Sequence, residues 1–225
     1  WVCTTSGTTA TCTNSSPITN GSNSTFSVPF IPVAGQVGSP LTVPTATVSG
    51  GGEPTANNGN NTSTPVTTPS VTGMPDLTTT LGQPSPSPVA GQASLIPVTV
   101  SNVGTAPSVG TVTEVVQIPA GTTFGTFPSN NNGWVCTTSG TTATCTNSDP
   151  IANGANSTFS VPFIPVAGQV GSPLTVPTAT VSGGGEPTEN NGNNTSTPVT
   201  TPSVLGTPDL TTTLGQPSPS PVAGQ

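Results

Sequence analysis

Four cysteines are the residues of this chain whose type and spacing most clearly indicate chemistry. They form two identical pairs, Cys3/Cys12 and Cys136/Cys145, and each pair brackets the same segment, TTSGTTAT. The Gly-Thr step at its centre favours a two-residue hairpin turn with glycine at the first central position. Counting outward from that turn places the two cysteines opposite each other in a non-hydrogen-bonded pair, where side chains are closest. The spacing therefore predicts one cross-strand disulfide per pair, contributing about 2–3 kcal/mol, with free buried thiols as the alternative.

The same thiolates are poorly placed to bind a metal. A four-thiolate zinc site would need both pairs, which lie in separate domains, and the chain contains no histidine to assist. Disulfides persist mainly in oxidising compartments, so the sequence predicts an extracellular or cell-surface protein.

The charged residues exclude several classes of function. The 225 residues include no Lys, Arg, His or Tyr, and seven acids give a net charge of −7. Without cations the chain cannot neutralise nucleic-acid phosphates, and no base is present to activate a hydroxyl nucleophile. We therefore expect neither an enzyme nor a nucleic-acid-binding protein, and no cofactor. The scattered acids are Glu53, Asp76, Glu114, Asp149, Glu186, Glu189 and Asp209.

Two features could bind ions or carry sugar. The loop 183–194 is rich in the oxygen ligands that Ca²⁺ prefers, but it lacks regular acid spacing, so a plain surface loop is favoured. Glycosylation is the second possibility, because Asn-x-Ser/Thr sequons are frequent. They begin at Asn14, Asn23, Asn60, Asn61, Asn156, Asn193 and Asn194.

Each tryptophan lies two residues before the first cysteine of a pair. Trp1 and Trp134 therefore share a sheet face with their disulfides. Packing in a core against the bridge is the favoured interpretation, and an exposed platform that stacks on sugar is the alternative.

An internal repeat organises the whole chain. Residues 1–92 return as residues 134–225 with six substitutions, which gives a period of 133 residues. A period of this length is a domain rather than a solenoid unit. Pro/Gly-rich linkers place one complete domain at 76–204, the C-terminal part of another at 1–71 and the first strand of a third at 209–225. We expect the chain to be part of a longer tandem array.

Short alternating apolar runs predict strands rather than disorder. The expected strands are 76–81, 93–101, 111–118, 122–127, the hairpin 134–147, 157–166, 174–182 and 195–204. Seven to nine strands in a domain of this size favour an all-β, immunoglobulin-like β-sandwich with one disulfide hairpin per repeat. Prolines at 97, 162 and 177 are expected at edges or bulges, because proline cannot donate to the ladder. No run approaches the roughly 20 apolar residues of a membrane span.

The order of several motifs resembles a family of repeats. The motifs are Val89-Ala90-Gly91-Gln92, Val98 to Gly104, Ile118 to Thr122, Gly133 to Cys136, Thr178 to Val181 and Asn190-Asn191. In this order they resemble the immunoglobulin-like tandem repeats of bacterial adhesins and envelope proteins, a family of mostly unknown function. The resemblance covers the whole period and implies the sandwich fold, but no catalytic residues. The absence of lysine departs from repeats that form Lys–Asn isopeptide cross-links.

Two functional hypotheses follow. In the first, near-identical domains of low charge form a structural repeat subunit of an extracellular fibre, sheath or adhesin stalk that self-associates. Missing strands of the partial domains would come from the same polypeptide or from a neighbouring molecule. In the second, the chain is a glycan-binding adhesion module that displays a tryptophan or the Asn-rich loop.

Overall fold

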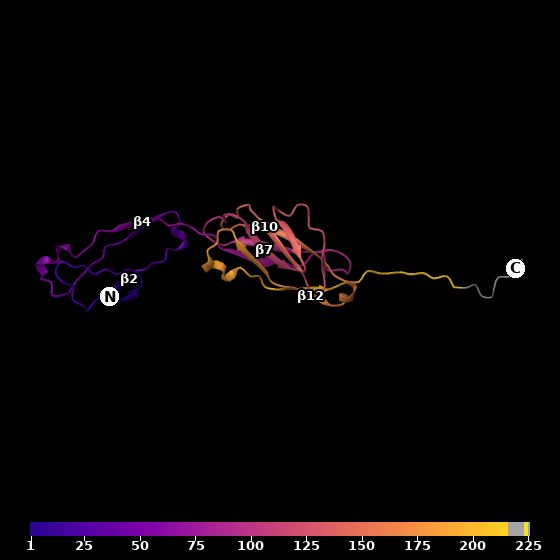
Figure 1. Cartoon of the computed structure of the whole chain (residues 1–225), viewed down its shortest axis with the longest axis horizontal. Helices are drawn as coiled ribbons and strands as arrows, with labels where there is room; N and C mark the ends of the chain where they lie inside the picture. Colours follow the sequence, from indigo (N-terminus) through magenta and orange to yellow (C-terminus); the bar gives the residue numbers. More distant parts are fainter. Residues whose placement is uncertain (216–222, 225) are drawn as a thin grey trace. The chain divides into compact units, whose positions relative to one another are not determined.

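The computed structural model describes residues 1–215 and 223–224. The chain divides into two compact units, Trp1–Gly73 and Met74–Gln225. Strands are the main regular secondary structure of both units, although most of the first unit is irregular (Figure 1). Helical structure is confined to four 3-10 segments in the described residues: η1 (Ala34–Gln36), η2 (Thr55–Asn60), η3 (Ala167–Gln169) and η4 (Thr188–Asn193).

The second unit is a β-sandwich. One sheet has the order β13 (Ala179–Gly183), β7 (Val112–Gln117), β10 (Thr142–Asn147) and β9 (Val135–Ser139). The other has the order β5 (Leu77–Leu81), β6 (Ser94–Asn102), β11 (Asn156–Ile164) and β8 (Thr123–Phe124). A separate pair joins β12 (Pro173–Val176) to β14 (Val199–Ser203). The predicted all-β sandwich with one disulfide hairpin per repeat is confirmed.

The core lies between the two four-stranded sheets. In β6, alternate residues are buried along the whole strand, with Ile96, Val98 and Val100 facing inward. In the neighbouring strand β11, Phe159 and Phe163 are also buried. Alternation works here because successive side chains of a strand point to opposite faces.

Two prolines lie on inner strands rather than at the predicted edges. Pro97 is in β6 and Pro162 is in β11, which are neighbours in the middle of one sheet. The Pro97 carbonyl accepts a hydrogen bond from Gly82 N, just beyond the end of β5, and the Pro162 carbonyl accepts one from Gly125 N, just beyond β8. At each proline, the backbone edge that lacks an N–H donor faces a position where the neighbouring strand has already ended.

Pro177 divides the expected strand 174–182 into β12 and β13. These two strands pair with different partners, β14 and β7. This division gives ten strands, β5 to β14, where seven to nine were expected.

The first unit repeats only part of this architecture. The hairpin β1 (Val2–Ser6) and β2 (Thr9–Thr13) forms one two-stranded sheet, and β3 (Pro40–Val43) with β4 (Val66–Ser70) forms another. Residues 23–31, whose sequence is identical to that of β11, form no strand. The unit therefore keeps its local pairs and lacks a second sheet to enclose a core.

The segment expected to begin a third domain is also unpaired. Residues 209–215 form no strand, although they repeat the sequence of β5, and Leu210 and Leu214 are exposed. The rest of the expected segment, 216–222 and 225, lies outside the described residues. In the second unit, β5 forms by pairing with β6, and no such partner lies beside residues 209–215.

Candidate functional site

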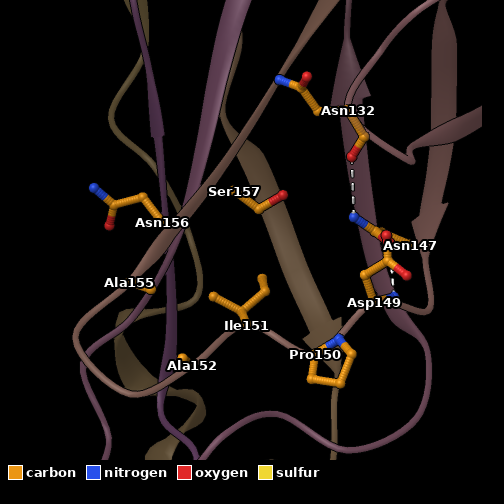
Figure 2. A pocket seen from close by; sticks show the side chains of 9 residues that line it. All are labelled: Asn132, Asn147, Asp149, Pro150, Ile151, Ala152, Ala155, Asn156 and Ser157. Atoms are coloured by element: carbon orange, nitrogen blue, oxygen red, sulfur yellow. Dashed lines mark hydrogen bonds between the residues drawn. The ribbon is translucent and has the colours of Figure 1, made fainter.

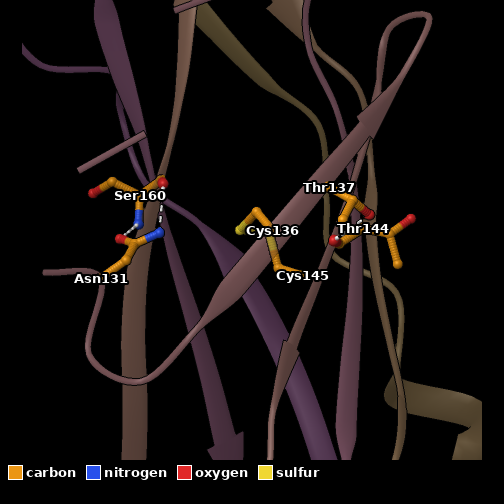
Figure 3. Close-up of a disulfide and its surroundings, with 6 residues drawn as sticks. All are labelled: Asn131, Cys136, Thr137, Thr144, Cys145 and Ser160. Carbon is orange, nitrogen blue, oxygen red and sulfur yellow. Dashed lines mark hydrogen bonds between the residues drawn. A yellow bond between two sulfur atoms is a disulfide. The ribbon is translucent and has the colours of Figure 1, made fainter. Parts of the chain in front are cut away.

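The disulfide hairpins are alike in the two units. Cys3 pairs with Cys12 and Cys136 with Cys145, directly across the strands, and both bonds are formed with Cα atoms 4.0 Å apart. The turn glycines, Gly7 and Gly140, have φ of +57°, as a turn with glycine at the first central position requires. Figure 3 shows the second bridge joining β9 to β10, with Thr137 and Thr144 beside it.

The tryptophan beside each disulfide stacks on a phenylalanine. Trp134 and Phe159 have ring centroids 4.5 Å apart, and the indole Nε1 donates to Ser157 Oγ at 2.9 Å. Trp134 is only 5% exposed, which supports core packing over an exposed sugar platform. The first unit has the same stack, Trp1 on Phe26 at 4.5 Å, and the same hydrogen bond to Ser24 at 2.8 Å.

The main candidate surface is an exposed apolar face of the first unit that includes the Trp1–Phe26 stack. We call it the open face and define it by the residues Trp1, Ile18, Phe26, Val28 and Phe30. Phe26, Val28 and Phe30 are 47%, 49% and 56% exposed. Exposed large apolar side chains of this kind make the open face a candidate interaction site.

In the second unit, the residues equivalent to the open face are covered. Phe159, Val161 and Phe163 are 4%, 0% and 0% exposed. Segment 74–133 supplies β6, which pairs beside β11 in the same sheet, and β7 in the opposite sheet, and these side chains lie in the core between the two sheets. The same chain thus displays both the bare face and the segment that closes it.

Asn131 supports β11 on its other backbone edge. Its amide Nδ2 donates to the carbonyl of Ser160, and its Oδ1 accepts from Ser160 N at 2.9 Å (Figure 3). Residues of the segment 74–133 therefore bond to both edges of β11. The first unit has no equivalent of either contact within residues 1–73.

The Gly/Asn-rich loop of the second unit is held by internal hydrogen bonds. Glu186 accepts from Leu77 N and from Asn194 Nδ2, both at 2.7 Å. Its carboxylate therefore anchors β5 to the loop. In the first unit Glu53 keeps the bond from Asn61 at 2.7 Å, and its Oε1 is left for a donor equivalent to Leu77 N. No group of three or more metal-ligating side chains exists among the described residues.

Most acids remain scattered, but the position of one was missed by the sequence analysis. Glu114 in β7 is fully buried between the sheets, and Thr79 Oγ1 of β5 donates to its Oε1 at 2.7 Å. Desolvation raises the pKa of Glu114 to about 8, against a smaller lowering by the Thr79 hydrogen bond. Its inward position could have been recognised because Val112, Glu114 and Val116 alternate in β7.

The sequon asparagines have different environments. Asn194 is buried and bonded to Glu186, and Asn193 donates to Asp76 Oδ1 at 2.8 Å. Asn156 lies exposed at the start of β11. The remaining sequon asparagines lie in the first unit, at Asn14, Asn23, Asn60 and Asn61; of these Asn14 and Asn61 are half-buried and the other two are exposed.

Comparisons with known proteins find similarity in solved structures only. No family model matches the chain, and no curated protein matches it. The chain is similar to a chain of the CaDoc0917–CaCohA2 complex, with 16% identity, a TM-score of 0.39, and coverage of 57% of this chain and 99% of that one. It is also similar to a non-cellulosomal cohesin of the archaeon Archaeoglobus fulgidus, with 14% identity, a TM-score of 0.36, and coverage of 56% and 88%.

A third similar structure is the chitin-binding domain of Chi18aC from Streptomyces coelicolor, with 24% identity, a TM-score of 0.34, and coverage of 48% of this chain and 92% of that chain.

Among the described residues, no helix has the length and apolar character needed to cross a membrane. The two disulfides are typical of extracellular proteins.

Proposed function

We propose that the chain is a structural repeat subunit of an extracellular bacterial fibre, sheath or adhesin stalk. In this proposal, the open face of the first unit is completed by a segment with the sequence of residues 74–133. The segment comes either from the preceding repeat of a tandem array or from a neighbouring molecule. Both routes make each repeat a link in a fibre.

One observation carries this proposal: Phe30 is 56% exposed, whereas Phe163 at the equivalent position of an identical strand sequence is fully buried. Burying apolar surface stabilises by about 25 cal/mol per Å², and in the second unit Phe163 lies in a core to which segment 74–133 contributes β6 and β7. An unpaired strand sequence beside an apolar face is a template for strand addition. A second copy of segment 74–133 should fit the open face best, because that segment already closes the equivalent face of the second unit.

Part of the open face is preorganised for this completion. The Trp1–Phe26 stack and the Trp1–Ser24 hydrogen bond have the geometry of their counterparts in the closed unit. Glu53 also retains its bond to Asn61, as Glu186 does to Asn194. A completing segment would therefore meet contacts already in place, which lowers the entropy cost of association.

Particle size tests the proposal. The 225-residue chain should associate as its concentration rises, whereas residues 74–206 alone, with their core closed, should remain monomeric. Light scattering and electron microscopy over a concentration series would measure both. If the 225-residue chain stays monomeric throughout, and an array with residues 74–133 joined ahead of Trp1 still exposes Phe30, the proposal fails. The proposal assigns no catalytic role, since the sequence contains no Lys, Arg or His.

A further inference from the structure

The sequence differences between the two copies are concentrated around one pocket. Three of the six substitutions, Ser16/Asp149, Thr19/Ala152 and Ser22/Ala155, fall within the seven-residue stretch 149–155 of a 92-residue repeated segment. All three substituted positions line a cavity of about 280 Å³ in the second unit (Figure 2). Such clustering separates this pocket from the rest of a nearly invariant surface.

The pocket combines polar and apolar groups. Figure 2 shows Ser157 and Ile151 on one side, with Asn147 and Asp149 on the other. Asn147 is already bonded, since its Oδ1 accepts from Asp149 N at 2.8 Å and its Nδ2 donates to the Asn132 carbonyl at 3.4 Å. These bonds hold the Asp149 backbone in a fixed turn.

Two polar groups remain available to a ligand. Neither carboxylate oxygen of Asp149 has a hydrogen-bond partner among the described residues, and Asp149 is exposed to solvent. Ser157 Oγ accepts from the Trp134 indole at 2.9 Å, so its hydroxyl hydrogen is left to donate. The pocket therefore offers an acceptor and a donor above an apolar floor of Ile151, with Ala152 and Ala155 at its rim.

We propose that this pocket binds one uncharged sugar residue, and that the two copies differ in this binding. A carboxylate accepts hydrogen bonds from sugar hydroxyls, Ser157 donates one, and the apolar groups face ring C–H bonds. A divalent cation is a poorer fit, because Asp149 is the one acid in the pocket and cations prefer several oxygen ligands. Acidic sugars are disfavoured because Asp149 would repel their charge.

The first copy keeps equivalents of Ser157 and Ile151, at Ser24 and Ile18, but lacks the carboxylate and the two alanines. It has Ser16 in place of the carboxylate, and the hydroxyls of Thr19 and Ser22 bond to each other at 2.8 Å. Those hydroxyls occupy the positions of the two small alanines, Ala152 and Ala155. The site is independent of the open face, so its ligand and the assembly of the chain can be tested separately.

Saturation-transfer NMR on the intact 225-residue chain tests this proposal. The probes are the methyl glycosides of glucose, galactose and N-acetylglucosamine, with sialic acid and CaCl₂ as further arms. At least one neutral glycoside should receive saturation, and Asp149→Ser should raise its Kd at least about tenfold, because a charged hydrogen bond is lost. Ala152→Thr with Ala155→Ser should also abolish binding, by narrowing the pocket.

A matched control comes from another difference between the copies. Glu189→Ala removes one exposed carboxylate outside the pocket, where the first copy has Ala56, and should leave binding unchanged. All the variants install residues that the other copy already carries. Failure of every neutral glycoside would overturn the proposal, as would binding that survives Asp149→Ser and the double alanine variant, preferential binding of sialic acid, or a response to CaCl₂ alone.

Discussion

Residues 1–73 and 134–206 are nearly the same sequence in two different structural states. The states share the disulfide hairpin, the Trp–Phe stack and the 3-10 turns, including the Val33 N to Gln36 and Val166 N to Gln169 bonds at 2.9 Å. They differ at 23–31 and 156–164, where an identical sequence is unpaired in one unit and strand β11 in the other. Local chemistry therefore determines hairpins and turns, whereas a sheet strand also needs a partner strand that the first unit does not contain.

The pair β3–β4 illustrates the local side of this comparison. It reproduces the register shift of β12–β14, and in both cases a threonine hydroxyl accepts the backbone N–H at the irregularity, Leu41 N to Thr68 at 3.0 Å and Leu174 N to Thr201 at 2.9 Å. These contacts lie within about 30 residues of sequence and do not need the second sheet. The closed state differs from the open one because it also contains strands from segment 74–133, which lies outside the repeated hairpins and turns.

The largest expected effect comes from supplying that segment. An array with a further copy of residues 74–133 joined ahead of Trp1 should give the first unit a cooperative unfolding transition of domain size, about 5–15 kcal/mol. Burial of the open face is the physical cause. Chemical denaturation followed by tryptophan fluorescence would measure it, and an unchanged, non-cooperative first unit would contradict the comparison.

Glu114 should make the closed unit sensitive to pH. Its folded pKa of about 8 lies above the ordinary value of 4.5, so the folded state retains a proton that the unfolded chain releases. The resulting stabilisation is complete below about pH 4.5 and is lost as the pH rises to about 8, a fall on the order of 4–5 kcal/mol. Urea unfolding of residues 74–206 across this range would show the fall.

Glu114→Gln is the matched control for that slope. The amide keeps an acceptor for Thr79 Oγ1 and does not ionise, so the unfolding free energy should be nearly independent of pH over the same range. A slope that persists in this variant would assign the pH dependence to other groups.

Equivalent core substitutions should have unequal costs in the two units. Phe163→Ala should destabilise the second unit by about 3–5 kcal/mol, because a fully buried ring leaves a cavity. Phe30→Ala should cost less than about 1 kcal/mol in the dilute chain, because that ring is half exposed. Denaturation curves of both variants test this difference, and equal costs would mean that the first unit is closed in solution.

Removing the disulfides should have the smallest effect of these changes on the free energy of unfolding of the second unit. Replacing Cys136 and Cys145 by alanine should cost the second unit about 2–3 kcal/mol through the entropy of its unfolded state. Replacing Cys3 and Cys12 should leave the Phe163 environment unchanged. Thermal unfolding of both variants would test this, and a loss of the second unit in the Cys3/Cys12 variant would mean that the units fold as one.

The sequence predicts the local features well and the non-local ones less well. The Gly-Thr turn fixes the register of both cysteine pairs, and the alternation at 96, 98 and 100 identifies the inward face of β6. The inner-strand positions of Pro97 and Pro162 depend on where β5 and β8 end, which local patterns do not encode. Alternation in β7 places Glu114 on the inward face, but its hydrogen-bond partner, Thr79 of the other sheet, is a non-local contact that the sequence does not indicate.

Exposure of the open face had no local signal at all, because residues 23–31 and 156–164 are identical in sequence. The two differ in having or lacking the strands supplied by segment 74–133. The pocket at 149–155 had a signal in the sequence, the clustering of three substitutions, but its meaning required the fold that brings Asn132 and Ser157 beside the turn.

Hydrogen exchange of the intact chain tests the central claim most directly. Peptides spanning 22–31 and 155–164 differ in mass because Ser22 is replaced by Ala155, so mass spectrometry can follow both in one sample. In the 225-residue chain we expect strong protection of 155–164 and little protection of 22–31, whereas an array with residues 74–133 joined ahead of Trp1 should protect both peptides. Equal protection of both peptides in the dilute 225-residue chain would contradict the account, as would a 22–31 peptide that stays unprotected in the array.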